Sequence, residues 1–226
     1  MIILHHLADS RSSRIIWLLE EMKVPYKLKH YDRKSPALED NGKTYIESAA
    51  VIEHLVRKYK RDLKPSEDNL DALEKYEFWM HYAEGSLMML VVGLFVNNKA
   101  VDMSPLVSRF LVRKVTNTIN ENYYLKELFL NLEHVDDFLS TSKFVTGDHF
   151  TAADVQMSYP LLCLQSTVLK SRPYTNIKRW LIEVTSRPAF EVASHKAHDK
   201  VFQLLNETTQ GKDEEIADFS SFSISA

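Results

Sequence analysis

The sequence predicts an α+β domain followed by an all-α helical-bundle domain. Within the first 60 residues, short apolar or alternating segments and helical patterns follow one another in the order β-α-β-β-β-α. From Asn69 onward, apolar residues recur only at helical spacing. The polar, proline-containing stretch between these parts has the composition of an interdomain linker. We therefore expect a mixed domain over residues 1–60, a linker over 61–68 and a helical domain over 69–206.

The first half is expected to alternate strands and helices. Asp9 and Ser10 supply a helix start directly after the first apolar segment. Asn41-Gly42 is a strong signal for a hairpin turn between two strands. In chain order, the expected elements are a strand over residues 2–7, a helix over 9–22, strands over 25–30, 36–39 and 43–46, and a helix over 47–56.

The second half is expected to contain helices only. Thr151, with an acidic Asp154 three residues later, is a capping box that predicts a helix start. Periodicity is lost after Glu207, and an acidic run with a serine-rich end predicts a mobile tail over 207–226. The expected helices cover residues 70–99, 105–119, 125–139, 151–169, 176–186 and 189–205.

Composition narrows the function classes. The 226 residues are 45% hydrophobic and 26% charged, as in an average globular protein. A net charge of -3 supplies no basic field that would hold nucleic acid, so no nucleic-acid partner is expected. Neither of the glycine-rich nucleotide-binding motifs G-x-G-x-x-G and G-x-x-x-x-G-K-[ST] is present. Of the histidines His5, His6, His81, His195 and His198, the last two have i, i+3 spacing but no clear acidic third ligand. No His-Glu-x-x-His motif exists, so no metal is expected.

The sequence predicts a cytoplasmic protein. The longest apolar run, residues 87–96, is shorter than the roughly 20 residues that cross a bilayer, so no transmembrane segment is expected. The start of the chain lacks the basic region of a signal peptide. The single cysteine, Cys163, allows no internal disulfide and indicates a reducing compartment. Peripheral association with a membrane surface stays open.

Several segments together resemble one enzyme family. Residues 10–21 (SRSSRIIWLLEE), 24–26 (VPY), 35–39 (SPALE) and 47–52 (ESAAVI) resemble, in order and spacing, the glutathione-binding half of cytosolic glutathione transferases. Residues 147–154 (GDHFTAAD), 176–180 (NIKRW) and 187–190 (RPAF) resemble the helical second domain of that family. Residues 82–87 (YAEGSL) and 110–115 (FLVRKV) are similar to a fungal and bacterial class that includes the yeast Gtt-type enzymes.

This resemblance implies a thioredoxin-like first domain that binds glutathione as a thiolate. Glutathione would be a co-substrate, conjugated to a small hydrophobic electrophile, and no cofactor would be permanently bound. Reduction of a hydroperoxide by the same thiolate is a second implied activity, and a homodimer is the implied assembly. The rival interpretation is a non-catalytic binding or regulatory module that keeps the fold, because fold alone does not fix function.

The resemblance is interrupted between Arg33 and Lys34. Members of the family usually carry a loop, a second helix and a His-Pro-Leu-Gly stretch there. Either the protein lacks this segment or the sequence omits it. One wall of the peptide site is therefore expected to differ.

Ser10 and Ser12 are the candidates for the catalytic group. A hydroxyl at a helix start, together with nearby amides and the helix dipole, favours the thiolate form of a bound thiol. On spacing alone, Ser10 is more simply a helix cap. The resemblance favours a catalytic Ser10, with Ser12 as the alternative.

The remaining glutathione contacts are assigned by the resemblance. Pro36 would be a cis-proline that exposes the backbone of Ser35 to the cysteinyl part of the ligand, although an ordinary trans-proline would suit a strand start. Glu47 and Ser48 open a helix whose free N–H groups suit the γ-glutamyl carboxylate, with capping alone as the simpler interpretation. Lys34 would hold the glycyl carboxylate, or would be a solvated lysine.

The electrophile would contact an apolar helix face. Tyr82, Met88 and Met89 lie on the long helical pattern of residues 70–99, and methionine suits adaptable surfaces. Packing in the core or in a dimer explains most of this face equally well. Cys163 lies in an apolar helix, so we expect a small buried side chain rather than a nucleophile.

Overall fold

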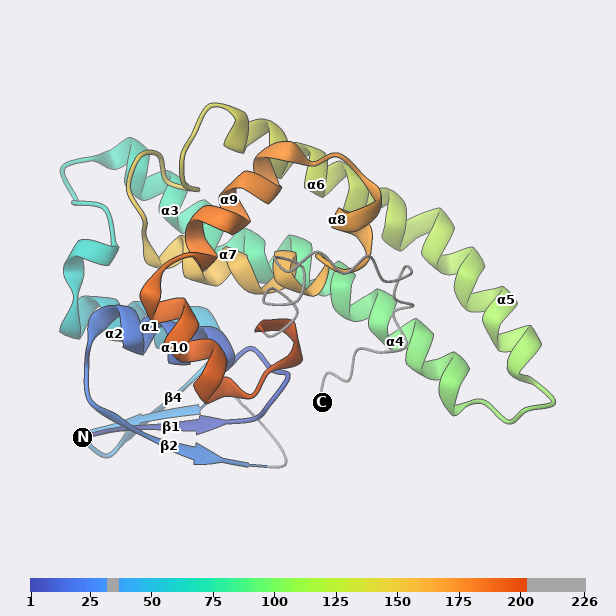
Figure 1. Ribbon diagram of the computed structural model, residues 1–226, viewed down its shortest axis with the longest axis horizontal. Coiled ribbons are helices and arrows are strands. Elements are labelled where there is room, and N and C mark those ends of the chain that lie inside the picture. Colours follow the sequence, from blue (N-terminus) through green and yellow to red (C-terminus); the bar gives the residue numbers. More distant parts are fainter. Residues whose placement is uncertain (32–36, 203–226) are drawn as a thin grey trace.

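The computed structural model describes residues 1–31 and 37–202. Figure 1 shows a small sheet at one end of the molecule and long helices that extend away from it. The sheet has four strands in the order β2-β1-β3-β4. The first elements are β1 (Ile2–His6), α1 (Ser13–Met22), β2 (Tyr26–His30), β3 (Ala37–Asp40), β4 (Lys43–Ile46) and α2 (Ser48–Tyr59). The expected order β-α-β-β-β-α is confirmed.

The strand register brings three separate chain segments to one end of the sheet. β1 pairs with β2 in parallel and with β3 antiparallel, and β3 pairs antiparallel with β4. His5 lies opposite Ala37, and Ala37 lies opposite Ile46. The ends of β1 and β4 and the start of β3 therefore lie together, and we call this the carboxyl end of the sheet. Asn41 and Gly42 have φ values of 50° and 79°, as the expected hairpin turn requires.

One face of the sheet is buried, and the other is only partly covered. Ile2, Leu4 and Leu38 are buried under α1 and α2. Side chains that point to the opposite face, such as Ile3 and Glu39, stay half-exposed. In Figure 1, α1, α2 and α10 all lie on the same side of the sheet.

The second half of the described chain is helical. After the short 3-10 turn η1 (Arg61–Leu63), the chain forms a bundle in which α7 packs against α1, α3 and α9. Its elements are α3 (Leu70–Tyr82), η2 (Ala83–Met88), α4 (Met89–Met103), α5 (Arg109–Ile119), η3 (Asn120–Tyr124), α6 (Leu125–Ser140), α7 (Ala152–Cys163), α8 (Val168–Ser171), α9 (Thr175–Thr185) and α10 (Pro188–Ala197).

Two helical stretches contain π-helical turns, η2 and η3. α3, η2 and α4 run on without a break from Leu70 to Met103, and length and composition alone would let this stretch cross a membrane. The core helix of a globular domain meets the same criteria, and α3 packs against α7 within this bundle.

Three expected helix boundaries are wrong. The helix expected over 151–169 ends at Cys163, and residues 164–167 form tight turns before α8. Val168 and Leu169 are buried in the same core, so the apolar spacing continues across the break. The last expected helix ends at Ala197, because His198 takes a left-handed φ of 48°. α5 begins at Arg109, after a turn in which Arg109 N–H donates to Pro105 O.

The capping box of α7 is confirmed and forms a buried polar anchor. Asp154 accepts hydrogen bonds from the backbone N–H groups of Thr151 and Val145. Its carboxylate also accepts from Trp180 Nε1 at 2.9 Å. These bonds fix α7 against α9, and α7 in turn supports α1.

Candidate functional site

The candidate thiol site lies where β1 passes into α1. Ser10 is in the turn after β1, and α1 begins at Ser13 with Ser12 as its N-cap. The expectation that Ser10 starts the helix is therefore corrected by three residues. Ser10 is 5% exposed and Ser12 is completely buried.

Both serine hydroxyls form hydrogen bonds within the turn. Ser10 Oγ donates to Leu7 O at 2.8 Å and lies 2.8 Å from Ser12 Oγ. Ser12 Oγ also lies 2.7 Å from His6 Nδ1 and accepts from Leu7 N–H at 3.3 Å. The turn is thus a hydroxyl network in which Ser12 is the more heavily bonded member.

The partners of His6 identify the donor of each bond. His6 Nε2 lies 2.8 Å from Ala197 O, and a carbonyl only accepts, so Nε2 carries the hydrogen. Burial lowers the pKa of His6, although its hydrogen bond to Ala197 acts in the other direction, so the ring is neutral and Nδ1 is an acceptor. Ser12 must then donate its proton to His6. The Ser12 hydroxyl has no further proton for a ligand, whereas Ser10 gives its proton only to its own turn.

A partly buried ion pair connects this turn to the helical half. Arg14, in α1, is completely buried and pairs with Glu84 of η2, which also accepts from Arg11 Nε at 2.9 Å. Burial acts to raise the pKa of Glu84, but Arg14 and Arg11 outweigh it and hold the pKa below its usual value. Glu84 is therefore an anion that ties both arginines to the long helix.

Glu47 and Ser48 lie at the carboxyl end of the sheet, as expected from β4. Glu47 has a φ of 68°, a left-handed conformation that is unfavourable for a residue with a side chain. Such conformations cluster at ligand-binding positions, where the surrounding structure holds them. Glu47 is exposed and Ser48 is buried at the first position of α2, with no side-chain cap bond from Glu47. Two helix starts, those of α1 and α2, therefore lie at the same end of the sheet.

The other assigned glutathione contacts, Lys34, Ser35 and Pro36, lie outside the described residues, as does the Arg33–Lys34 junction. Ala37 is the first described residue after them, and it lies opposite His5 and Ile46. The chain therefore re-enters the described structure at the carboxyl end of the sheet. The expected tail over 207–226 also lies outside the described residues.

The three residues assigned to the electrophile pocket are not brought together. Met88 is completely buried in the core, which corrects its assignment, whereas Met89 is 51% exposed. Tyr82 is half-buried and its hydroxyl donates to Asn131 Oδ1 at 2.5 Å. Of the three, Tyr82 and Met89 keep surface that a ligand or a partner could contact.

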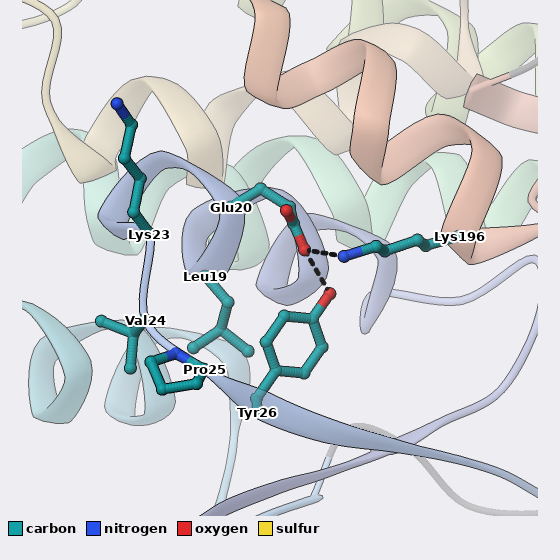
Figure 2. A pocket seen from close by; sticks show the side chains of 7 residues that line it. All are labelled: Leu19, Glu20, Lys23, Val24, Pro25, Tyr26 and Lys196. Atoms are coloured by element: carbon teal, nitrogen blue, oxygen red, sulfur yellow. Dashed lines mark hydrogen bonds and ion pairs between the residues drawn. The ribbon is translucent and has the colours of Figure 1, made fainter.

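Two surface cavities are lined by residues outside the turn that contains Ser10. Figure 2 shows the first, about 400 Å³, where Tyr26 and Lys196 both bond to Glu20. The second, about 310 Å³, is apolar and lies between Phe78, Trp79, His134 and Phe138. Among residues 1–31 and 37–202, no group of three or more His, Cys, Asp or Glu side chains is placed to hold a metal ion.

Several contacts of the site could not be identified from the sequence. The sequence gives no reason to place His6, Glu84 or Asp199 at this turn, and it places Arg14 near Ser10 without indicating a partner for it. Their contacts join segments that are 70 to 191 residues apart in the chain. The one feature of the sequence that could have indicated these contacts is Arg14, which lies inside the apolar pattern of α1.

The fold and the site together define a class of protein. A thioredoxin-like sheet carries a hydroxyl-bearing turn and two helix starts at its carboxyl end, and an all-helical half packs against it. The family model for the C-terminal domain of glutathione S-transferases matches residues 99–188. The chain is 46% identical to Glutathione S-transferase 3 of Schizosaccharomyces pombe over 223 residues, covering 92% of each chain.

Solved structures show the same architecture. A delta-class glutathione transferase from Nilaparvata lugens superposes with a TM-score of 0.71 and 21% identity, covering 92% of this chain and 99% of that one. A glutathione S-transferase from Actinobacillus pleuropneumoniae has a TM-score of 0.64 and 26% identity, covering 88% and 93%. The chain belongs to the glutathione S-transferase family. The predictions of this family, of its two-part fold and of a glutathione-conjugating enzyme are confirmed.

Proposed function

We propose that glutathione binds at the carboxyl end of the sheet, with its sulfur at the turn that contains Ser10, and that its thiolate attacks a small hydrophobic electrophile. The observation that supports this proposal is the register His5–Ala37–Ile46, because it brings the ends of β1 and β4, and so the segments with Ser10 and Glu47–Ser48 that follow them, to the same end of the sheet. Anions are favoured at helix N-termini, which suits both the thiolate and the γ-glutamyl carboxylate.

The hydrogen-bond network supports Ser10 over Ser12 as the group that contacts sulfur. Ser12 donates to His6 and cannot donate a second time. Ser10 donates to Leu7 O, and rotation of the Ser10 hydroxyl toward a ligand would break this one bond. Leu7 O also lies 3.2 Å from Ser12 Oγ. A charge-assisted bond to the thiolate is stronger than the neutral bond it replaces.

The test separates binding from chemistry. Ser10→Ala, Glu47→Gln and Ser48→Ala are compared for glutathione affinity by calorimetry and for conjugation of a chromogenic aryl halide. We expect Ser10→Ala to lower turnover more than affinity, and the Glu47 and Ser48 variants to lower affinity. Unchanged thiol ionisation in the Ser10→Ala complex, followed by thiolate ultraviolet absorbance, would reject the assignment. Hydroperoxide reduction is a further prediction for the same thiolate and is assayed in parallel.

A homodimer is the proposed assembly, and exposed apolar side chains on α4 support it. Met89, Val96 and Met103 recur every seven residues and are 51%, 55% and 76% exposed. A repeat of seven keeps these side chains on one stripe of the helix, as in helix–helix seams. A second copy of this chain would cover the stripe, because most soluble oligomers are two-fold homodimers. A location in a reducing compartment also stays a prediction, which the free, buried Cys163 supports.

A further inference from the structure

The segment that follows α10 is bonded to the turn that precedes α1. We call residues 197–200 the strap and residues 7–12 the thiol turn. His6 Nε2 donates to Ala197 O at 2.8 Å, and Lys200 N–H donates to Asp9 Oδ1 at 2.8 Å. Ser13 Oγ donates to Asp199 Oδ2. Three hydrogen bonds from different residues thus hold the strap across the thiol turn, 186 to 191 positions away in the chain.

Asp199 is the buried centre of this contact. Its side chain is completely buried, and its Oδ1 accepts from Val201 N–H at 2.9 Å. No ion pair is formed by Asp199 with a basic side chain of residues 1–31 or 37–202. A buried carboxylate without a cationic partner is costly, so burial favours the neutral form of Asp199.

The titratable and charged groups around Asp199 come from three elements. Asp9 faces it from the thiol turn, and Tyr159 and Cys163 face it from α7. From α1, Ser13 bonds to it, and the Arg14 guanidinium is already bonded to Glu84 and Gln156 O. Within its own segment, His198 and Lys200 are exposed neighbours.

The backbone on both sides of the contact is in a left-handed conformation. Asp9 has a φ of 54° and His198 a φ of 48°. Neither is glycine, so each position is unfavourable by an amount that the surrounding bonds must offset. The Lys200 N–H bond to Asp9 and the Ala197 O bond to His6 flank these two residues. The bonds between the strap and the thiol turn therefore flank two residues with left-handed backbone conformations.

We propose that Asp199 is a positioning residue for the thiol site, acting through Ser13 and Asp9 on the turn that carries Ser10. This rests on the proposed role of Ser10. Asp199 contacts no ligand; it fixes the first residue of α1 and, through the strap, the path of residues 7–12. The orientation of the Ser10 hydroxyl and of the α1 dipole toward sulfur then depends on the strap.

The contact is also sensitive to pH. Burial raises the pKa of Asp199 to about 7, and Asp9 acts in the same direction, whereas the bonds from Ser13 and Val201 oppose the shift. A carboxyl whose folded pKa exceeds its unfolded value stabilises the fold below the unfolded pKa, and this contribution is lost as pH rises through the folded pKa. We expect the strap to loosen as pH rises past about 7, when Asp199 ionises opposite Asp9.

The experiment compares Asp199→Asn, Asp199→Ala and Ser13→Ala, with the exposed Asp71→Asn as the matched control. The first readout is amide hydrogen exchange of residues 8–13 in the free protein between pH 6 and 8. After correction for the intrinsic rise of amide exchange with pH, we expect the protection of these amides to fall with pH in the parent protein. Protection should stay constant in Asp199→Asn and be low at both pH values in Asp199→Ala and Ser13→Ala. Exchange in Asp199→Asn that follows the parent profile would overturn the proposal.

The second readout is conjugation at saturating and at limiting glutathione. We expect Asp199→Ala to lower kcat about tenfold or more with little change in the glutathione KM, and Asp199→Asn to retain kcat while losing the parent's pH dependence near 7. Equal loss in both variants, or a change in KM alone, would contradict a positioning role. The hydrogen-exchange readout uses no glutathione, so it decides on the strap even if Ser10→Ala shows that the sulfur is bound elsewhere.

Discussion

Arg14 Nη1 donates to the carbonyl oxygen of Gln156 at 2.9 Å, across the contact between α1 and α7. In a regular helix that carbonyl would accept from the N–H of residue 160, but residue 160 is proline and has no N–H. The acceptor that Pro160 leaves free in α7 is therefore used by the buried arginine of α1. The proline in α7 thus leaves an acceptor that is bonded by a charged side chain close to the thiol turn.

We expect Arg14→Met to lower the free energy of unfolding by about 1–3 kcal/mol, the cost of leaving a buried carbonyl unsatisfied. The larger cost of an orphaned buried charge does not apply, because Glu84 keeps its pair with Arg11. Adding Pro160→Ala supplies a helical N–H to Gln156 O and should recover part of the loss. Urea unfolding of both variants measures this, and a double variant no more stable than Arg14→Met would refute the explanation.

Ser10→Ala and Ser12→Ala should differ in their effects on folding stability and on the pKa of the bound thiol. Ser12→Ala leaves His6 Nδ1 and Leu7 N–H without their partner, so we expect a loss of about 1–3 kcal/mol in stability. Ser10→Ala loses the donor to Leu7 O and the weak acceptor of Ser12 N–H, so we expect a smaller loss of stability than in Ser12→Ala, together with a rise in the pKa of the bound thiol. Each unit of that rise is worth about 1.36 kcal/mol of lost thiolate preference. Thermal unfolding and thiol titration of the two variants should give opposite rankings.

The loss of folding stability at acid pH should depend on Asp40. Burial acts to raise the pKa of this carboxyl, but hydrogen bonds from Lys58, His54 and Tyr59 outweigh it and lower the pKa to about 2. A depressed folded pKa stabilises the fold above the unfolded value of 3.8, and this contribution is lost as pH falls toward 2. Asp40→Asn should therefore be less stable than the parent at pH 7, with the difference shrinking between pH 4 and 2 in denaturant titrations.

The stripe on α4 predicts a two-fold interface. A Met89→Glu, Val96→Glu double variant should sediment as a particle of about half the parent mass while keeping its helical circular dichroism. Ile182→Glu, on α9, is the matched control, because Ile182 is 68% exposed and off the stripe. A parent protein that already sediments at 26.2 kDa would contradict the dimer.

The order of elements was predictable because it depends on local patterns. Apolar spacing and the Asn41-Gly42 turn gave β1 through α2, and Thr151 with Asp154 gave the start of α7. The π-helical turns η2 and η3 were not predicted, because such turns are rare interruptions and α-helical spacing was expected throughout. The end of α10 was missed because His198 ends the helix in a left-handed conformation, and the residue that most often marks such an end, glycine, is absent there.

The candidate site was predictable only in part. Ser10, Glu47 and Ser48 follow strand ends, and strand register alone brings them to one end of the sheet. Their supports were not predictable, because the His6–Ala197 and Ser13–Asp199 bonds join the first residues to the last described ones. The assignment of Met88 failed because neighbouring residues on a helix point in different directions, so Met88 is core while Met89 is surface.

The burial of Cys163 has a practical consequence for an enzyme of this kind. It is the only cysteine in the chain and is 1% exposed, and burial raises the pKa of its thiol well above the ordinary value. Electrophiles that react with a thiolate would alkylate any accessible cysteine of the catalyst itself. With its one thiol protonated and enclosed, the protein offers such electrophiles no accessible thiolate, and a thiol-directed reagent should leave the glutathione-free protein unlabelled.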